Sequence, residues 1–533
     1  MLRQLLRERK NFLQLVLIIL LGMAESGLLL WQISCIKDVF DCAVNGERNS
    51  LISALIRLGI LILATTAVRY TVVYCRDLFS VRFRNGLSIS LFDKFLSSEH
   101  RGAEEMHSGD VMSRIVQDTV CVTTFFSDVL PSIVSNVVLL VGAFGYLCVI
   151  NYKIALCIAV IVPLFILFGK LFLKKADQYT REVRSVEAQS QALFQEVVQN
   201  KLVIKVNRTV GYVLGQYKKL AVKMESSVVN KTRYNVKMNF IMALGLGAGY
   251  LVTLGWGCLL LVDGIITIGE MAAILQLSDR IQNPARALSD LIPQYAGFLV
   301  AKRRLQAIHQ RVLEKGNVIS LEPPLGISFE KVSFTYADSG KTVLHNFSFN
   351  FKPNCFTIVK GESGAGKTTL VNLILSVYKP DSGDIIAYDS QKEIQLTSGI
   401  RDYIEYVPQG NNMLSGTVEE NLRIGNPNAS HAEMEEALRL ACADFVLSSE
   451  EGLSTICAEK GVGFSEGQAQ RVLIARALLR KRPILILDEA TSALDDKTEN
   501  LLMNNLMSMA SKTVIFITHK KYQEGIADNI LNL

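Results

Sequence analysis

Residues 361–368 have the composition of a phosphate-binding loop. They read Gly-Glu-Ser-Gly-Ala-Gly-Lys-Thr and match the pattern GxxxxGK(S/T) in full. The apolar segment CFTIVK precedes them and the amphipathic segment TTLVNLILSVY follows, so the loop is predicted to join a strand to a helix. Glycines let backbone N–H groups turn toward phosphates, and the helix N-terminus adds partial positive charge. We expect Lys367 to reach the terminal phosphates and Thr368 to hold Mg²⁺.

A second motif, ILILDE at residues 484–489, ends in two carboxylates. Its four consecutive apolar residues suit a strand that is covered on both faces of a parallel sheet. Asp488 would support Mg²⁺ and Glu489 would polarise an attacking water molecule. Open α/β sheets bind ligands at the carboxyl ends of their strands. We therefore expect both acids to lie beside the phosphate loop.

A third motif, FSEGQAQR at residues 464–471, is predicted to begin a helix with Ser465 as its N-cap. The start of such a helix is a second possible anion site. Taken alone, an ordinary capped helix explains these residues equally well.

These motifs require an α/β domain, and the character of the sequence changes near residue 321. The segment LEPPLGISFEKVSFTY opens with two prolines and then alternates apolar and polar residues, as an edge strand does. We place a domain boundary there and read residues 296–320 as a last helix and linker. Residues 321–533 are expected to form an α/β phosphate-loop nucleotide-binding domain.

The composition indicates a chain that is part membrane-embedded and part soluble. Half of the 533 residues are hydrophobic, 20% are charged and the mean hydropathy is +0.28, which excludes disorder, collagen and a small disulfide scaffold. The net charge is +13 over residues 1–320 and −7 over residues 321–533. The basic residues lie between apolar stretches, which favours lipid head groups over nucleic acid as partners. The ten cysteines form no CxxC pair, so we interpret them as small buried side chains and not as disulfide or metal ligands. The six histidines show no spacing typical of metal ligands.

Six apolar stretches are each long enough to cross a bilayer, which takes ~20 helical residues. They cover residues 11–34, 51–75, 129–150, 153–173, 238–262 and 265–293. Residues 1–320 are therefore predicted to form an all-α transmembrane domain of six helices. Basic residues before the first stretch, and in the two long connections, place these parts in the cytoplasm. Spans two to five are expected to continue as helices beyond the bilayer, with tips near residues 97–108 and 205–217.

Three ionisable residues, Glu25, Arg57 and Arg69, fall inside the predicted spans. A charge at the bilayer centre costs ~2.5–3.5 kcal/mol on insertion scales, so these side chains should face a cavity or a partner. They either line a translocation pathway or form a structural ion pair. The sequence leaves both interpretations open.

In the order of its motifs, the chain resembles the ATP-binding cassette (ABC) transporters, and more closely an exporter-type (type IV) half-transporter with six spans and one cassette. Tyr336 in VSFTYADS resembles the aromatic residue that stacks on adenine. The Walker A loop comprises Gly361, Glu362, Ser363, Gly364, Ala365, Gly366, Lys367, Thr368 and Thr369. Gln409 corresponds to the Q-loop glutamine, and Ser465, Gly467 and Gln468 correspond to the signature. Asp488 and Glu489 correspond to Walker B and the catalytic glutamate. Residues 492–495 correspond to the D-loop, and His519 corresponds to the switch histidine. Residues 108–118 and 455–461 are similar to exporter-type segments.

The resemblance implies ATP and Mg²⁺ as ligands. It assigns catalysis to Glu489, His519, Gln409 and Lys367, and Mg²⁺ binding to Thr368, Gln409 and Asp488. It also implies that two cassettes close head to tail over two ATP molecules, so the chain would act as a homodimer or a heterodimer. The Q-loop and the two tips would transmit the motion to the membrane.

The sequence departs from the family pattern in two places. The signature reads FSEGQ, so Glu466 adds an acid near the phosphates, and a modest loss of ATP affinity is the expected effect. The sequence continues for only 14 residues after His519, so we expect a cassette that is shortened at its C-terminus.

The preferred function is ATP-driven export of an amphipathic or apolar substrate, such as a lipid, a peptide or a drug-like molecule, by alternating access. The expected location is the bacterial cytoplasmic membrane, with the N-terminus and the cassette in the cytoplasm and no nucleic-acid partner. Two alternatives stay open: an importer on an exporter-type scaffold, such as a siderophore system, and an ATP-gated channel or sensor.

Overall fold

The computed structural model describes residues 9–98, 111–112, 114–314, 320–336, 340, 342–362, 364–457, 463–509, 511–519 and 527–533. The chain divides into two compact units. Within the described ranges, residues 9–95 and 111–310 belong to the first unit, and residues 96–98 and those from 311 onward to the second. The expected boundary after residue 320 adjoins residues outside these ranges and stays a prediction.

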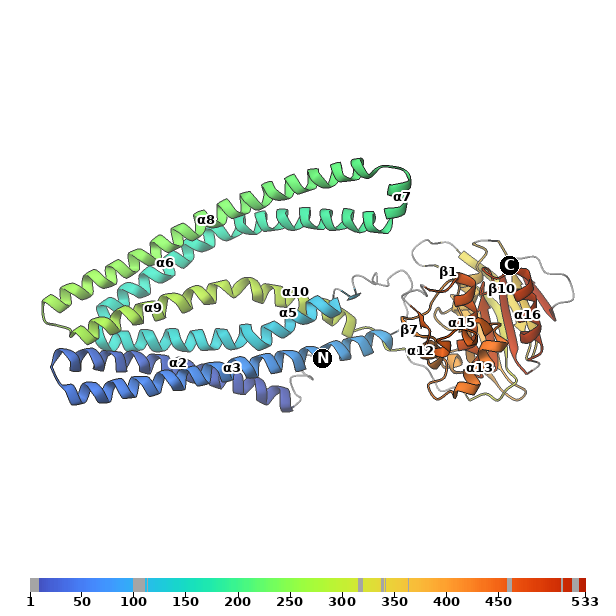
Figure 1. The fold of residues 1–533 in the computed structure, drawn as a ribbon, viewed down its shortest axis with the longest axis horizontal. Helices are drawn as coiled ribbons and strands as arrows, with labels where there is room; N and C mark the ends of the chain where they lie inside the picture. The colour runs from blue at the N-terminus through green and yellow to red at the C-terminus, as the bar shows by residue number, and fades with distance from the viewer. Residues whose placement is uncertain are drawn as a thin grey trace. The chain divides into compact units, whose positions relative to one another are not determined.

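The described part of the first unit is entirely helical (Figure 1). Its elements are α2 (Arg9–Val44), α3 (Arg48–Leu96), the π-helical turns η2 (Arg114–Asp118) and η3 (Phe125–Val129) around α5 (Thr119–Thr124), α6 (Leu130–Gln199), α7 (Lys201–Val206), α8 (Val210–Val262), α9 (Ile268–Asp290) and α10 (Ile292–His309). The helix α6 bends back at Asn151, whose extended backbone (φ −155°, ψ 104°) interrupts the helical conformation. This bend separates the third expected span from the fourth.

Four helical segments of the described chain are long and apolar enough to cross a membrane: Lys10–Val44, Arg48–Leu96, Arg114–Val160 and Val210–Val262. They contain the expected spans one, two, three and five. The fourth expected span, residues 153–173, is helical within α6. The sixth, residues 265–293, corresponds mainly to α9, which is too rich in charged residues to be among the four. Many residues of α9 are buried, and Ile274, Leu277 and Ile281 pack in a core with residues of α2 and α6. Because α9 packs largely against protein, its own sequence needs fewer apolar residues than a helix that faces lipid on most sides.

The long connection between α6 and α8 is helical, as the sequence predicts. The two helices run side by side and α7 lies at their far end (Figure 1). A turn at residues 207–209 joins α7 to α8, so the tip expected at residues 205–217 contains the end of α7 and the start of α8. The other tip, expected at residues 97–108, lies outside the described residues after residue 98.

The second unit contains two main sheets. The antiparallel sheet has the order β2-β1-β4-β5, and the parallel sheet has the order β11-β3-β10-β9-β6. Their strands are β1 (Gly326–Thr335), β2 (Thr342–Phe351), β4 (Ser382–Tyr388) and β5 (Glu393–Gln395), then β3 (Phe356–Lys360), β6 (Ile404–Val407), β9 (Ile484–Asp488), β10 (Thr513–Thr518) and β11 (Asn529–Asn532). A small pair, β7 (Gly416–Thr417) and β8 (Ile456–Cys457), stands apart.

The register of the parallel sheet brings the chemical motifs to one edge. Thr518 pairs with Lys360, Ile517 pairs with Asp488, and Val407 pairs with Leu487. The phosphate loop, the two acids, His519 and Gln409 each follow one of these strand ends. This arrangement confirms the fold predicted for the second half of the chain.

Both faces of the parallel sheet are buried, which explains its near-continuous apolar strands. On β9, Leu485 and Leu487 pack in one core with the helices α15 (Glu466–Leu478) and α16 (Asp496–Met507). Ile484 and Ile486 pack in a second core with α11 (Lys367–Ile374) and the antiparallel sheet. The sheet is therefore the rigid layer on which the site is built.

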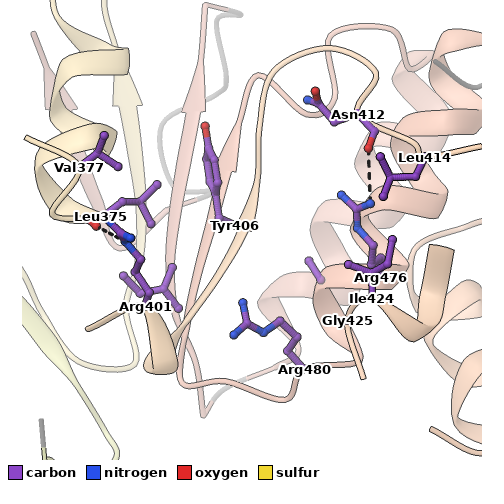
Figure 2. A pocket seen from close by; sticks show the side chains of 12 residues that line it. Leu375, Val377, Arg401, Tyr406, Asn412, Leu414, Ile424, Gly425, Arg476 and Arg480 are labelled. Atoms are coloured by element: carbon purple, nitrogen blue, oxygen red, sulfur yellow. Dashed lines mark hydrogen bonds between the residues drawn. The ribbon is translucent and has the colours of Figure 1, made fainter. Parts of the chain in front are cut away.

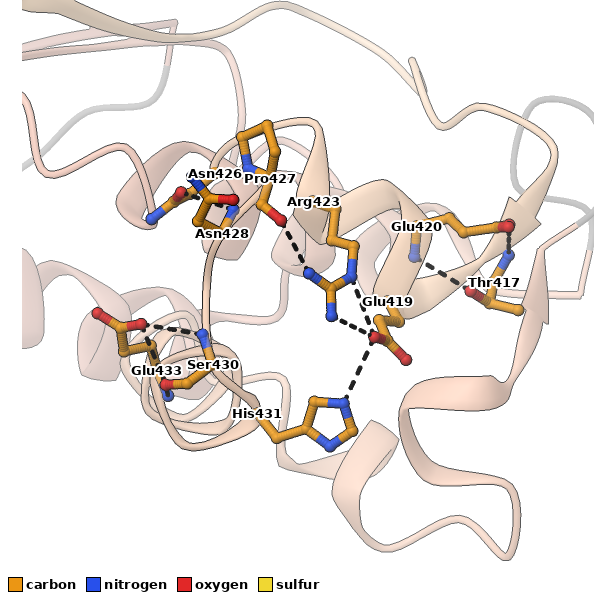
Figure 3. Close-up of polar contacts among 10 residues, drawn as sticks. All are labelled: Thr417, Glu419, Glu420, Arg423, Asn426, Pro427, Asn428, Ser430, His431 and Glu433. Carbon is orange, nitrogen blue, oxygen red and sulfur yellow. Dashed lines mark hydrogen bonds and ion pairs between the residues drawn. The ribbon is translucent and has the colours of Figure 1, made fainter.

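A group of short helices supports α15. They are α12 (Val418–Arg423), α13 (His431–Leu440) and α14 (Asp444–Leu447), and the first two pack against α15. The helix α13 begins with a reciprocal cap between Ser430 and Glu433 (Figure 3). The Glu419 carboxylate lies 2.7 Å from an Arg423 nitrogen and 3.4 Å from His431 Nε2 (Figure 3). The contact of Glu419 with His431 joins α12 to the start of α13. Both helices pack against α15, the helix that begins at the third motif.

Candidate active site

The phosphate loop runs from β3 to α11 with the backbone conformation that its glycines allow. Gly364 and Gly366 have φ values of +87° and +106°, a region that side chains disfavour. A Cβ atom at Gly366 would also lie 2.8 Å from Val343 Cγ1. Ser363 lies outside the described residues. The predicted strand–loop–helix context of this motif is confirmed.

Lys367 is 8% exposed and is the first residue of α11, directly after the loop glycines. Its Nζ atom donates to the carbonyl oxygens of Gly361, at 2.7 Å, and Glu362, at 3.3 Å. The same atom lies 3.7 Å from Glu489 Oε1. The lysine therefore sits between the loop and the acid at the end of β9, where it can meet a negatively charged phosphate group.

Glu489 occupies the first position after β9 in a left-handed conformation, with φ of +49°. Its N–H donates to the carbonyl of Ile517 at 3.0 Å, which holds the backbone against β10. The Gln409 amide donates to Glu489 Oε2 at 2.6 Å, and His519 Nδ1 lies 3.8 Å from the same oxygen. Four residues that the sequence placed in catalysis, Lys367, Gln409, Glu489 and His519, therefore meet at one carboxylate.

Asp488 is 4% exposed and lies beside this group. Burial, and to a lesser extent the neighbouring Glu489 carboxylate, raises the pKa of Asp488 to about 6, although Lys367 and the hydroxyl of Tyr406 act in the opposite direction. A buried carboxylate with a second carboxylate beside it gains from a cation that compensates both charges.

Tyr406 is a site residue that the sequence reasoning missed. Its hydroxyl donates a hydrogen bond to Asp488, and burial followed by the charge of that acid raises the pKa of the phenol, so it stays protonated. Its strand β6 pairs with β9, with Tyr406 opposite Ile486. The available signal was an aromatic residue three positions before Gln409, in the segment YVPQ.

The same tyrosine lines a groove of about 580 Å³ beside the site (Figure 2). Leu375, Leu414 and Ile424 give the groove apolar walls. Three basic side chains also line it: Arg401, Arg476 and Arg480. Tyr406 thus has a face in the groove and a hydroxyl on Asp488. An occupant of the groove would contact a residue that touches the acid.

The residues present fit Mg²⁺. Thr368 is exposed, and its hydroxyl has no hydrogen-bond partner in the described part of the chain. The side-chain amide of Gln409 donates through its nitrogen to Glu489, so its oxygen is a second possible ligand for the ion. Among the described residues, no three His, Cys, Asp or Glu side chains converge on a metal position. Mg²⁺ binds one or two protein oxygens together with water and substrate phosphates, and Thr368, Gln409 and Asp488 would supply such oxygens. The bound ion would neutralise phosphate charge.

Tyr336 lies at the end of β1 and reaches the start of α11. Its hydroxyl lies 2.9 Å from Thr369 Oγ1, and its ring meets those of Phe334 and Tyr378 edge to face, with centroids 5.1 and 5.7 Å apart. The ring is therefore held close to the phosphate loop. Its stacking on adenine stays a prediction.

The third motif begins α15, as predicted. The N–H of Gln468 donates to Ser465 Oγ at 3.2 Å, and the Ser465 N–H donates to Gln468 Oε1 at 2.9 Å. Gly467 is buried, and a Cβ atom there would lie 2.6 Å from the carbonyl oxygen of Ala493. Glu466 is exposed on the first turn of the helix. Only glycine fits this close approach to residues 492–495.

The structure does not unite this motif with the first group of residues. Across the described ranges, no hydrogen bond or ion pair joins Ser465, Gly467 or Gln468 to Lys367 or Glu489. In the loop before the signature, Thr455 donates to the carbonyl of Gly452 at 2.7 Å. Glu459 and Gly461 lie outside the described residues.

Two family models cover most of the chain. Residues 15–284 match the ABC transporter transmembrane region, and residues 344–492 match the ABC transporter model. The chain belongs to the ABC transporter family. The fused domains, together with export ATP-binding/permease relatives, identify an integral membrane protein that binds and hydrolyses ATP for transport.

Relatives of this ABC transporter match it along nearly its whole length. A protein of Rickettsia prowazekii, provisionally named as an export ATP-binding/permease protein, is 28% identical over 99% of this chain and 92% of its own length. An uncharacterized ABC transporter ATP-binding protein of Bacillus subtilis is 29% identical over 97% and 90%. The structure of a bacterial Atm1-family ABC exporter with ATP bound covers 98% of this chain and 93% of its own, with a TM-score of 0.83 and 22% identity. This last likeness confirms the two-part fold.

Proposed function

We propose that this ABC transporter is an ATP-driven exporter that moves an amphipathic or apolar substrate out of the cytoplasm or the inner leaflet by alternating access. The observation that carries the proposal is the meeting of Lys367, Gln409 and His519 at the Glu489 carboxylate, on the ligand-binding edge of a parallel sheet. In this arrangement Glu489 orients and polarises the attacking water molecule. Lys367 and the N–H groups of the loop stabilise the charge on the transferred phosphoryl group.

We infer that the working unit is a dimer of half-transporters. Ser465 and Gln468 begin a helix that presents N–H groups suited to a phosphate, yet in the described chain no hydrogen bond or ion pair joins them to the Glu489 group. The signature of one chain would complete the site of the other. Both a second copy and a different half-transporter satisfy this requirement.

The membrane unit offers the means to convert closure into movement. The helices α6 and α8 contain 70 and 53 residues, while a bilayer core requires only ~20. Their connection at α7 would act, with the Q-loop, to pass motion to the spans. The charge distribution supports an orientation with the N-terminus and the cassette in the cytoplasm, and we place the protein in a bacterial cytoplasmic membrane.

The first test is Mg-ATPase activity of the purified full chain in lipid nanodiscs, beside Glu489→Gln and the control Glu393→Gln, which removes an exposed carboxylate on β5. We expect turnover in the wild type and the control, and a loss of at least ~10²-fold in Glu489→Gln. Equal turnover in all three proteins would contradict the assigned role of Glu489.

Transport is tested separately in inside-out vesicles with a fluorescent amphipathic probe. ATP-dependent accumulation in wild-type vesicles, absent with Glu489→Gln, supports export. Accumulation only in right-side-out vesicles would indicate an importer. ATP-dependent ion flux without accumulation would indicate a channel.

A further inference from the structure

The membrane unit contains a charged pocket that the ATP chemistry does not use. Its volume is about 260 Å³, and it lies between α2, α3, η3 and the first turns of α6. Four charged residues line it: Glu25, Arg69, Arg76 and Asp128. They form two ion pairs, so the pocket combines both signs of charge at no net charge.

The ion pairs have short and directional contacts. Arg69 Nε lies 2.8 Å from Glu25 Oε1, and an Arg76 terminal nitrogen lies 3.1 Å from Asp128 Oδ1. Each pair joins two different helical segments that are distant in the sequence. Charged groups in membrane spans occur mainly where they line a cavity or serve a function.

The first pair leaves donor groups available. Glu25 accepts from the Nε atom of Arg69, and within the described chain no acceptor meets the two terminal NH₂ groups of that guanidinium. The Arg69 side chain is 56% exposed. Two such groups form a planar fork that binds the oxygens of phosphate or carboxylate in a bidentate manner. An anionic ligand can therefore bind Arg69 without breaking the existing ion pair.

Close packing of α2 against α6 forms one side of the pocket. A Cβ atom at Gly22 would lie 2.4 Å from Ser135 Oγ, so α2 and α6 approach each other closely there. The hydroxyl of Ser26 donates to the carbonyl of Ser135 at 3.1 Å across the same contact. One wall of the pocket is thus formed by the close approach of Gly22 to the Ser135 side chain and by a hydrogen bond between the two helices.

The pocket lies along the predicted spans, toward the cytoplasmic end of the second. Glu25 lies inside the span predicted at residues 11–34, and Arg69 lies six residues before the end of the span predicted at residues 51–75. In the proposed orientation, that end of the second span faces the cytoplasm, so an amphipathic molecule in the inner leaflet can reach Arg69 with its head group.

We propose that this pocket binds the zwitterionic, phosphate-bearing head group of an amphipathic lipid substrate, with the phosphate on Arg69 and the ammonium group near Glu25 and Asp128. The inference rests on the proposed export function and names its substrate class. The pocket volume of about 260 Å³ lies below the ~300–1,000 Å³ of pockets that enclose a whole small molecule. This size suits a head group and not an entire lipid. The lipid tails would stay outside among apolar side chains.

The test is a binding isotherm of the full chain in detergent, measured by native mass spectrometry without ATP. The probes are dihexanoyl phosphatidylethanolamine, dihexanoyl phosphatidylglycerol, dihexanoylglycerol and inorganic phosphate. Arg69→Gln and Glu25→Gln are compared with Arg57→Gln, which removes an exposed arginine on α3 outside the pocket. A double variant, Glu25→Arg with Arg69→Glu, keeps an ion pair but moves the fork to α2.

We expect the wild type and Arg57→Gln to bind the phosphatidylethanolamine probe most tightly, and Arg69→Gln to bind it at least ~10-fold more weakly, since it loses charge-assisted hydrogen bonds. The charge-swapped variant should also lose affinity while keeping the wild-type melting temperature. Restored affinity in that variant, equal binding by all proteins, or preference for inorganic phosphate would overturn the proposal. Because the isotherm needs no hydrolysis, its failure and a failure of ATP-driven export are separate outcomes.

Discussion

The side-chain amide of Gln409 donates a 2.6 Å hydrogen bond to Glu489, a residue 80 positions further along the chain. The two residues follow β6 and β9, which are neighbouring parallel strands. The glutamine therefore fixes the direction of the carboxylate that would polarise water. It does so from a loop that also borders the groove beside Tyr406.

We predict that Gln409→Ala lowers the ATPase kcat by ~10–10²-fold, because a misplaced catalytic group loses its alignment with the reacting atoms. ATP binding should change little, since Lys367 and the loop supply most of the phosphate contacts. Steady-state ATPase and equilibrium binding of a fluorescent ATP analogue measure the two effects. Gln391→Ala, at an exposed turn, is the matched control. An unchanged kcat in Gln409→Ala would exclude this positioning role.

Tyr406→Phe should raise the Mg²⁺ concentration for half-maximal ATPase activity several-fold. The variant removes only the hydroxyl that donates to Asp488, so the acid loses a group that fixes its orientation. A Mg²⁺ titration at saturating ATP gives this value, and binding of ATP without Mg²⁺ serves as the internal control. A parallel loss of both quantities would indicate general damage to the sheet rather than a specific effect on Asp488.

Gly467→Ala is expected to reduce ATPase turnover by at least ~10-fold. The added Cβ would lie 2.6 Å from the Ala493 carbonyl oxygen, so the helix start and residues 492–495 must move apart. Gly59→Ala in α3, where no atom lies within 4 Å of the new Cβ, is the control. Wild-type turnover in Gly467→Ala would show that the close approach is not required for a closed site.

Glu466→Gly tests the departure of the signature from its family pattern. The acid is exposed at a helix start that is expected to face phosphate, so its removal should lower the ATP concentration for half-maximal turnover by ~2–5-fold through reduced charge repulsion. Glu436→Gly, at an exposed position of α13, is the control and does not share this position. ATP dependence that stays the same in Glu466→Gly would mean that the side chain points away from the nucleotide.

Lys512→Met should destabilise the cassette in a pH-dependent manner. Lys512 Nζ lies 2.8 Å from an oxygen of Glu405, whose side chain is fully buried. Removal of one partner of a buried pair costs ~3–5 kcal/mol in the free energy of unfolding. Burial raises the pKa of Glu405 above its usual value despite this lysine, so the folded state binds the proton more tightly than the unfolded state. The contribution of Glu405 to stability therefore improves as pH falls toward its unfolded pKa.

The melting temperature of Lys512→Met should consequently lie closer to that of the wild type at pH 5.5 than at pH 8. Thermal unfolding of the full chain, followed by intrinsic fluorescence, measures this difference. Lys497→Met, which removes an exposed lysine on α16, should match the wild type at both pH values. A deficit that grows on acidification would reverse the sign of this prediction.

The sequence by itself determined the fold class, the family and the local context of each motif. The pattern from Gly361 to Thr368 indicates a strand before it and a helix after it. The apolar run before Asp488 indicates a strand in a sheet that is covered on both faces. Both patterns are local, so they can be read from consecutive residues. The long helices of the membrane unit follow from sustained apolar composition in the same way.

Tertiary structure alone decided which side chains meet. The contact of Gln409 with Glu489, the hydrogen bond from Tyr406 to Asp488, and the pairing of Glu25 with Arg69 all depend on strand order and helix packing. Such contacts join residues tens of positions apart, and no local pattern encodes a distance of that kind. For Glu25 and Arg69, the sequence offered a cavity or an ion pair as alternatives. The structure shows an ion pair that lines a pocket, because the hairpin of α2 and α3 places both residues at the same height.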